Sequence, residues 1–112
     1  MKRIQAIIRP AVLEEIKEAL LAMDNKGMTI NQVMGCGNQQ GWTEYYRGSI
    51  NHMNMLPKIE VSIVTDEDKV DKIIDAIIKV ARTGDAGDGK IFVTNVERVI
   101  RIRTGEEGSN AL

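Results

Sequence analysis

Residues 83–90 have the sequence TGDAGDGK, a pattern suited to holding an anion. Three glycines in six residues let successive backbone amides turn toward one negative group, and Lys90 adds a positive charge beside them. The pattern is not a Walker P-loop, because that motif places Gly-Lys-Ser/Thr at the start of a helix, whereas Lys90 opens a strand-like run. The plainer interpretation is a helix-to-strand turn with a surface lysine, and the segment alone leaves both interpretations open.

Arg101 and Arg103 follow shortly afterwards and favour the anion-binding interpretation. A strand is expected over 97–103, and residues two apart on a strand point to the same face. Two guanidinium groups on one face repel each other unless an anion lies between them, and arginine is well suited to bidentate phosphate contact. Together with residues 83–90, the two arginines predict a polyphosphate-binding site. The alternative is pairing with nearby carboxylates, namely Glu97, Glu106 or Glu107.

The sequence offers no convincing base, nucleophile or dedicated metal cluster for phosphate chemistry, so no catalytic residue is assigned. The only histidine, His52, is expected to be an exposed polar residue of a long loop. Cys36 stands between glycines and is expected to be a small packing residue. Asp85 and Asp88 are typical turn formers. The pattern therefore predicts binding rather than catalysis.

Residues 38–56 form a stretch that no helical or strand period organises. It contains the only tryptophan, both tyrosines and the only histidine of the chain, together with Arg47. Compact domains rarely keep a connection longer than about 12–15 residues unless it is functional or disordered. We therefore expect a protruding recognition loop, for which the rest of the chain is a rigid mount.

The remaining sequence alternates between strand-like and helical periods. Strands are expected at 4–8, at 28–34, around Ile59, Val61 and Ile63, at 91–93 and at 97–103, and helices at about 12–25 and from Asp66–Asp68 to Ala81. Apolar residues on both faces of the first strand predict a central position for it. The order is β-α-β-(long loop)-β-α-β with a short extra strand, which predicts an α+β, ferredoxin-like fold with two helices on one face of an antiparallel sheet.

Composition limits the class of protein. A length of 112 residues predicts one domain, 1–112, ending in a polar tail over about 105–112 that is expected to be mobile. The net charge of −1 argues against a nucleic-acid binder. The N-terminus does not resemble a signal peptide, no apolar run approaches the roughly 18 residues of a membrane span, and the single cysteine fits a reducing cytoplasm. Apolar strands hint that other subunits cover the open face of the sheet.

The chain resembles the PII signal-transduction proteins, a nitrogen-regulatory family whose members act with ammonium transporters or nitrogen-metabolism enzymes. The most specific stretches are TEYYRG at 43–48, RTG at 82–84, GDGKIFV at 87–93 and VIRIRTGE at 99–106. Several motifs in register over nearly the whole chain are far more specific than one glycine motif. The resemblance implies a homotrimer with nucleotide sites in the clefts between subunits, where ATP and ADP compete.

The resemblance also implies roles for individual residues. Phosphates would be held by Gly87, Asp88, Gly89, Lys90, Arg101 and Arg103, and the adenosine side would be completed by Thr29, Gly37, Asn38 and Val64. Gln39 would help bind Mg²⁺ that bridges ATP and 2-oxoglutarate, and Lys58 would pair with a 2-oxoglutarate carboxylate. Amides near Gln39, Gln40 and Gly41 would complete that site. A dianion beside a triphosphate needs a cation between them and a lysine beyond.

In this family the long loop is the T-loop, and ligands at its two ends would select the conformation that it presents to a partner. Partner contacts are implied for Trp42, Tyr46, Arg47, Ser49 and Asn51, with Arg47 in the place of the residue that plugs ammonium-transporter pores. The resemblance thus implies membrane association only through a transporter.

Some positions depart from the family pattern. Asn51 stands where many relatives carry a nucleotidylated tyrosine, which excludes that modification at this position. Ser49 corresponds to a serine that some relatives phosphorylate. Asn38 and Gln40 replace basic residues, and this loss of positive charge is expected to weaken nucleotide or 2-oxoglutarate binding.

Three other functions compete with a non-enzymatic regulator. A phosphotransferase on the same fold lacks a placed histidine nucleophile. An RNA-recognition module needs stacking aromatics on the sheet, but the predicted strands carry only Phe92. A small-ligand regulatory module that binds no nucleotide is the third alternative.

Overall fold

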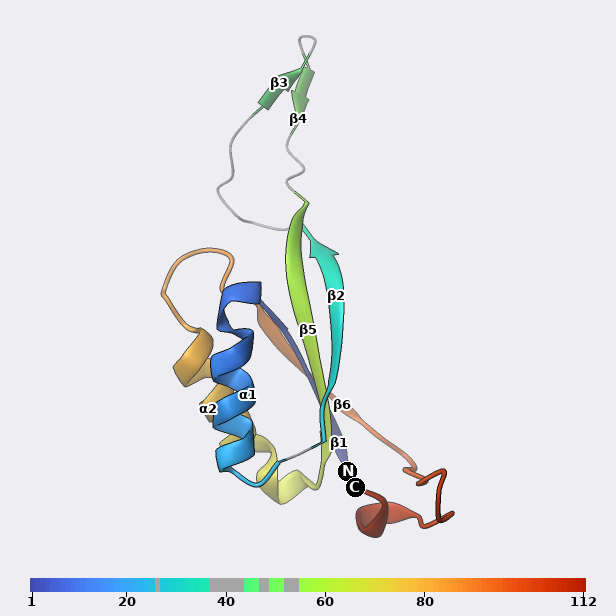
Figure 1. Ribbon diagram of the computed structural model, residues 1–112. Helices are drawn as coiled ribbons and strands as arrows, with labels where there is room; N and C mark the ends of the chain where they lie inside the picture. The colour runs from blue at the N-terminus through green and yellow to red at the C-terminus, as the bar shows by residue number, and fades with distance from the viewer. Residues whose placement is uncertain (26, 37–43, 47–48, 52–54) are drawn as a thin grey trace.

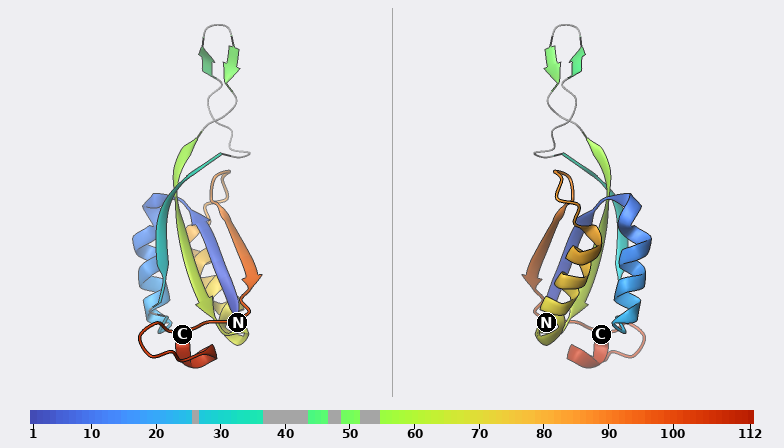
Figure 2. Two further views of the ribbon diagram at one scale, coloured as in Figure 1. Left: turned by 90° about the vertical axis from the view of Figure 1, so that its right-hand side faces the viewer. Right: turned by 90° about the vertical axis from the view of Figure 1, so that its left-hand side faces the viewer.

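The computed structural model describes residues 1–25, 27–36, 44–46, 49–51 and 55–112. Its main sheet has four antiparallel strands in the order β2-β5-β1-β6, and both α-helices lie against one face of it (Figures 1 and 2). The elements are β1 (Lys2–Ile8), α1 (Leu13–Ala22), β2 (Thr29–Gly35), β5 (Leu56–Thr65), α2 (Val70–Ala81) and β6 (Lys90–Asn95). This arrangement confirms the predicted α+β, ferredoxin-like fold.

Strand β1 occupies the central position that its sequence predicts. It pairs with β5 on one side and with β6 on the other. Ile4, Ala6 and Ile8 alternate along it and are at most 2% exposed, because they point into the layer between the sheet and the helices. From the helices, Ile16 of α1 and Ile73 of α2 fill the same layer.

Helix α1 is shorter than the predicted 12–25. Pro10 starts a 3₁₀ turn, Pro10–Val12, before the α-helix begins at Leu13. At the other end, Asp24 adopts a left-handed backbone with φ 59°, and the amide of Asn25 donates to the carbonyl of Leu20 at 3.0 Å. This bond closes the last turn, so the α-helix ends at Ala22 although the amphipathic pattern continues.

The other face of the sheet carries no helix in the described part of the chain. Four side chains there form a polar network: Arg3 Nε donates to Ser62 Oγ at 2.8 Å, and Gln5 Nε2 donates to Glu60 Oε1 at 2.6 Å. Arg3 also lies 3.6 Å from the Glu60 carboxylate. The predicted covering of this face by other subunits remains a prediction.

Two features near the long loop differ from the sequence-based expectation. Inside the stretch 38–56, where no regular structure was expected, β3 (Glu44–Tyr46) and β4 (Ser49–Asn51) pair as an antiparallel hairpin. Just before it, Cys36 was expected to be packed but is exposed. The described residues contain no helix long and apolar enough to cross a membrane.

The predicted strand over 97–103 is wrong. This part of the chain folds back on itself instead, with a single bridge between Ile100 and Glu107. The amide of Arg101 donates to the carbonyl of Glu106, and the amide of Gly105, at φ 72°, donates back to the carbonyl of Arg101. A glycine at this positive φ lets the chain reverse, and local turn bonds replace strand pairing. A 3₁₀ helix, Gly108–Ala111, follows, and Ser109 Oγ donates to Asp66 Oδ1 at 2.7 Å.

Candidate functional site

The glycine loop, residues 83–89, joins α2 to β6 and is closed by one carboxylate. Asp88 accepts hydrogen bonds from the Thr83 hydroxyl at 2.5 Å, the Thr83 amide at 2.8 Å and the Gly84 amide at 2.9 Å. These bonds favour the charged carboxylate, and the Thr83 hydroxyl contributes most to holding the pKa of Asp88 below its ordinary value. The carboxylate of Asp88 therefore shapes the loop from within.

Gly89 brings the loop against the central strand. Its φ is 108°, and a Cβ at this position would lie 1.7 Å from the backbone oxygen of Ile7. No other residue type fits such an approach without moving the backbone. Gly87 also has a positive φ, at 101°. The glycine pattern noted in the sequence thus has a steric cause at Gly89 as well as a conformational one.

Arg9, directly after β1, contacts the glycine loop at three points. Its guanidinium lies 3.0 Å from Asp88 Oδ1, and it donates to Thr83 Oγ1 at 3.2 Å and to the carbonyl of Ala86 at 2.8 Å. Sequence reasoning missed Arg9. The sequence does show that Arg9 follows the predicted central strand. Only the pairing of Ile7 with Lys90, however, shows that this end of β1 lies beside the glycine loop.

Lys58 joins the glycine loop to the base of the long loop. It is 8% exposed, and its ammonium donates to the carbonyl of Gly87 at 2.8 Å. Burial, with help from the nearby Arg9 charge, lowers the pKa of Lys58, whereas Asp88 acts in the opposite direction. Gly35 pairs with Leu56 where the long loop leaves the sheet, and a Cβ on Gly35 would lie 3.2 Å from Lys58 Cγ.

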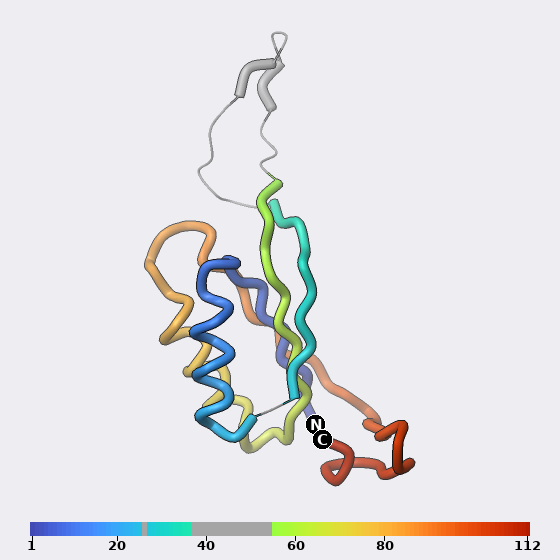
Figure 3. Tube along the Cα trace, in the orientation of Figure 1, coloured from blue at the N-terminus to red at the C-terminus, as the bar shows by residue number. Residues whose placement is uncertain are grey.

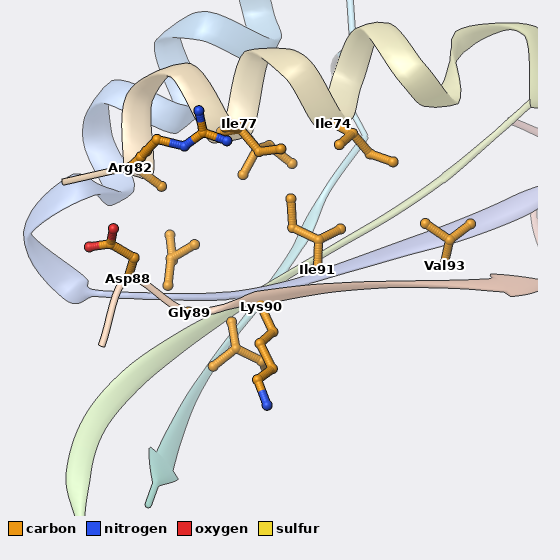
Figure 4. Close-up of a pocket in the computed structure, with 12 residues that line it drawn as sticks. Ile74, Ile77, Arg82, Asp88, Gly89, Lys90, Ile91 and Val93 are labelled. Carbon is orange, nitrogen blue, oxygen red and sulfur yellow. The ribbon is translucent and has the colours of Figure 1, made fainter. Parts of the chain in front are cut away.

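A cavity of about 430 Å³ lies beside the glycine loop, between α2 and β6. Its walls are mostly apolar, with Ile74 and Ile77 from the helix facing Ile91 and Val93 from the strand (Figure 4). The side chain of Lys90 leaves β6 on the opposite side from Ile91. The Lys90 ammonium therefore does not point into this cavity, and the other charged residues that line it are Arg82 and Asp88.

Arg101 and Arg103 are not brought next to the glycine loop. Lys90, at one end of β6, pairs with Ile7, whereas Asn95, at the other end, pairs with Lys2. The arginines come after Asn95, so they lie at the opposite end of the sheet from the glycine loop (Figure 3). A strand of this length spans roughly 20 Å. Within one chain, the two parts of the predicted polyphosphate site are therefore separate.

The two arginines also differ from each other. Arg101 is half-buried, donates to the carbonyl of Leu112 at 3.1 Å and lies 3.9 Å from Glu106, so the carboxylate pairing considered from the sequence is present there. Arg103 is exposed in the turn. Because neither lies on a strand, the expected two-residue alternation does not place them on one face.

Thr29 and Val64, predicted for the adenosine side, lie toward the same end of the sheet as the arginines. Thr29 begins β2 and pairs with Ser62 of β5, two residues before Val64. Residues two apart on a strand share a face, so Val64 and Ser62 point the same way. Lys58 lies near the other end of β5. One chain thus holds its predicted ligand-binding residues in two groups at opposite ends of the sheet.

Several predicted residues lie outside the described part of the chain: Gly37, Asn38, Gln39, Gln40, Gly41, Trp42 and Arg47. Tyr46, Ser49 and Asn51 lie in the strands of the β3–β4 hairpin. Their predicted roles in binding 2-oxoglutarate, Mg²⁺ or a partner stay predictions.

Comparison with known proteins gives one consistent result. Residues 1–106 match the family model for Nitrogen regulatory protein P-II. The chain is 52% identical over 112 residues to Nitrogen regulatory protein P-II of Nostoc punctiforme, covering all of both chains. It is 51% identical to Nitrogen regulatory protein P-II 2 of Methanothermobacter thermautotrophicus, covering all of this chain and 97% of that one. It is also 51% identical to Nitrogen regulatory protein P-II 1 of Escherichia coli, again over the whole of both chains.

Proposed function

Because this chain belongs to the nitrogen regulatory P-II family, we propose that it is a non-enzymatic transducer of nitrogen status. It binds ATP or ADP, and 2-oxoglutarate with Mg²⁺. Through the long loop at 38–56 it regulates an ammonium transporter or a nitrogen-metabolism enzyme. It works in the cytoplasm and reaches the membrane only through a transporter partner.

The hydrogen bond from Lys58 to the carbonyl of Gly87 is the observation that carries this proposal. It connects the loop proposed to hold phosphates with the strand that leads out of the long loop. Lys58 is the third residue of β5, which starts at Leu56. A ligand that engages Lys58 or the glycine loop therefore acts within a few residues of the base of the long loop and can bias its conformation.

A second copy of the chain is needed to complete the nucleotide site. Gly87, Gly89 and Lys90 lie at one end of the sheet, and Arg101 and Arg103 follow β6 at the other. A nucleotide held by both groups lies where one end of a subunit meets the opposite end of its neighbour. This requirement supports the proposed homotrimer with ligands in the clefts between subunits.

The 2-oxoglutarate site is proposed around Lys58. An ammonium group has three donors, and the Gly87 carbonyl takes one of them, which leaves donors for a ligand carboxylate. Mg²⁺ prefers oxygen ligands and commonly binds through a few protein groups plus substrate phosphates. The side-chain oxygen of Gln39, with oxygens of ATP and 2-oxoglutarate, fits that preference. When bound, the cation would offset repulsion between the two anions.

The proposal for the partner rests on the long loop. Trp42, Tyr46 and Arg47 supply the aromatic and cationic groups that commonly dominate protein interfaces. Ser49 is a candidate for phosphorylation, whereas Asn51 offers no hydroxyl for nucleotidylation. Replacing Arg47 with Glu is expected to abolish ADP-dependent association with an ammonium transporter, and intact association would exclude this role for Arg47.

The proposed function is tested by measuring the native mass of the purified protein and by calorimetry with ATP, ADP and ATP–Mg²⁺–2-oxoglutarate. A trimer is expected, with ATP and ADP competing and 2-oxoglutarate binding only with ATP and Mg²⁺. Lys58→Met is expected to abolish 2-oxoglutarate binding, while the matched surface variant Lys79→Met keeps it. A monomer that ignores adenine nucleotides at millimolar concentration would contradict the whole proposal.

A further inference from the structure

We propose that Arg9 is a positioning residue for the nucleotide site, acting with Lys58 as a clamp on two consecutive carbonyls of the glycine loop. The inference rests on the proposed nucleotide binding and adds a residue that touches no phosphate itself. Arg9 directly follows β1 and Lys58 lies in β5, and these two strands are neighbours in the sheet. Both reach the same loop from the sheet side.

The clamp sets the direction of two peptide units. Arg9 donates to the carbonyl of Ala86, and Lys58 donates to the carbonyl of Gly87, each at 2.8 Å. In a trans peptide unit the carbonyl and the amide N–H point in opposite directions. The amides of Gly87 and Asp88, which belong to these two units, therefore point away from the two cations. Consecutive amides that are free to face one side form the kind of concavity that binds anions.

Arg9 also offsets the one negative charge built into the clamped segment. Asp88 is held by Thr83 and Gly84 inside the loop, with its pKa below the ordinary value, so it stays a carboxylate at neutral pH. A bare carboxylate beside a polyphosphate would repel it. The guanidinium of Arg9, 3.0 Å from Asp88 Oδ1, offsets that charge.

An ordinary surface ion pair is the competing interpretation for Arg9, and such pairs contribute little. Three observations favour the clamp. Arg9 contacts three separate loop residues, Thr83, Ala86 and Asp88, rather than one carboxylate. Its side chain is only 30% exposed. One of its contacts is the backbone carbonyl of Ala86, which carries no net charge. A hydrogen bond to this carbonyl fixes the direction of the adjacent amide, which an ion pair alone would not do.

The test compares Arg9→Met, which removes the clamp, with Arg9→Lys, which keeps the charge but replaces the forked guanidinium with a compact ammonium group. Arg3→Met is the matched control, because Arg3 stands on the same strand and contacts Ser62 and Glu60 instead of the loop. Dissociation constants for ATP and ADP are measured by calorimetry. Exchange of the Thr83 and Gly84 amides, which both donate to Asp88, is followed by NMR without nucleotide.

Arg9→Met is expected to weaken ATP and ADP binding by about ten-fold or more, the size expected for losing hydrogen bonds from a charged group. Arg9→Lys is expected to recover part of that loss, and Arg3→Met to stay within about two-fold of the parent protein because it changes no loop contact. Amide exchange at Thr83 and Gly84 is expected to accelerate most in Arg9→Met, to a smaller extent in Arg9→Lys, and not in Arg3→Met. If Arg9→Met does not fold, Arg9→Lys carries both measurements.

The outcomes separate this inference from the proposed function. If the parent protein binds nucleotide and Arg9→Met binds equally well, the clamp is overturned while the proposed function stands. If Arg9→Lys binds nucleotide as tightly as the parent protein, or if Arg3→Met loses as much affinity as Arg9→Met, a specific role for the Arg9 guanidinium is also overturned. If the parent binds no nucleotide, the proposed function fails. In that case, exchange of the Thr83 and Gly84 amides without nucleotide still tests whether Arg9 orders the loop. Exchange in Arg9→Met that equals that of the parent protein rejects the clamp.

Discussion

The glycine loop and the C-terminal segment, residues 97–112, were both predicted to bind phosphate, but they are built in different ways. Two residues from outside hold the glycine loop, Arg9 after β1 and Lys58 in β5, and the bond from Thr83 to Asp88 closes it from within. The C-terminal segment mostly contacts itself, through Ile100 with Glu107 and through Arg101 with Glu106. One half of the proposed site is thus shaped within the chain, whereas the other half reaches outward.

Exposure of apolar side chains shows the same contrast. In the C-terminal segment, Ile102 is fully exposed and Ile100 is 51% exposed. At the glycine loop, Ile8, Ile77 and Ala81 of the apolar wall are at most 8% exposed, although Val93 is 42% exposed. Two large exposed apolar residues beside two arginines are typical of a surface that another protein covers. The comparison favours a second copy of this chain as the cover, in line with the proposed trimer.

Gly89→Ala is the substitution expected to destabilise the glycine loop most. The added Cβ would lie 1.7 Å from the Ile7 oxygen at a φ of 108°, so either the loop or β1 must move. We expect the free energy of unfolding to fall by about 3 kcal/mol or more, because backbone strain and overlap add. Urea denaturation at fixed protein concentration measures the change.

Gly84→Ala is the matched control for that substitution. Gly84 also has a positive φ, 91°, but an added Cβ would meet nothing within 4 Å. Only the conformational cost of about 1–2 kcal/mol is expected. Equal losses at the two glycines would show that φ alone, and not close approach to β1, determines the need for glycine at position 89.

Ile102→Glu tests whether a neighbouring copy covers the C-terminal segment. Because Ile102 is fully exposed in one chain, the fold of that chain should not depend on it. If a neighbouring copy covers it, however, each chain loses about 2 kcal/mol of apolar burial and gains a buried charge on association. We expect the native mass to shift from trimer to monomer, measured by analytical ultracentrifugation.

Leu21→Glu provides the control for Ile102→Glu. Leu21 is 55% exposed on α1, on the helix layer rather than on the C-terminal segment. This variant is expected to keep the native mass of the parent. An unchanged mass for Ile102→Glu would mean that the C-terminal segment is not at the interface, and the two-copy nucleotide site would lose its support.

The same contrast explains what the sequence could predict. The order of elements and the central position of β1 followed from periodicity, because burying one face of each element is a local requirement. The glycine loop was found from its residue types for the same reason: positive φ angles and turns are local properties. The predictions that failed depended either on contacts between distant residues or on a local turn that overrides a longer pattern.

Two residues show this limit in detail. Arg9 precedes Pro10 in an unremarkable sequence, and its role emerges only when β1 and the glycine loop are placed side by side. Arg103 alternates with Arg101 as in a strand, yet the turn stabilised by Gly105 overrides that pattern. An i, i+2 spacing predicts a shared face only if a neighbouring strand is available to pair, and within this chain β6 already ends at Asn95.

The smallest expected effect concerns pH and the closure of the glycine loop. The pKa of Asp88 is lowered most by the Thr83 hydroxyl, then by the Thr83 amide, with Gly84 and Arg9 adding to the effect. A carboxyl whose folded pKa is depressed contributes stability that is present above the unfolded pKa. That stability is lost as the pH falls through the folded value. The bonds that close the loop should therefore survive below pH 3.8, the ordinary value for aspartate, before acid opens them.

Thr83→Val removes the leading cause while leaving the backbone amides and Arg9 in place. The pKa of Asp88 is expected to rise toward its ordinary value without reaching it, because the amides of residues 83 and 84 still donate to the carboxylate. NMR titration of the Asp88 side-chain carboxyl carbon measures both values. Thr94→Val, an exposed site on β6 that pairs with Arg3, should leave the Asp88 titration unchanged. An Asp88 pKa that does not respond to Thr83→Val would mean that the loop is not closed within the chain, which would remove its contrast with the C-terminal segment.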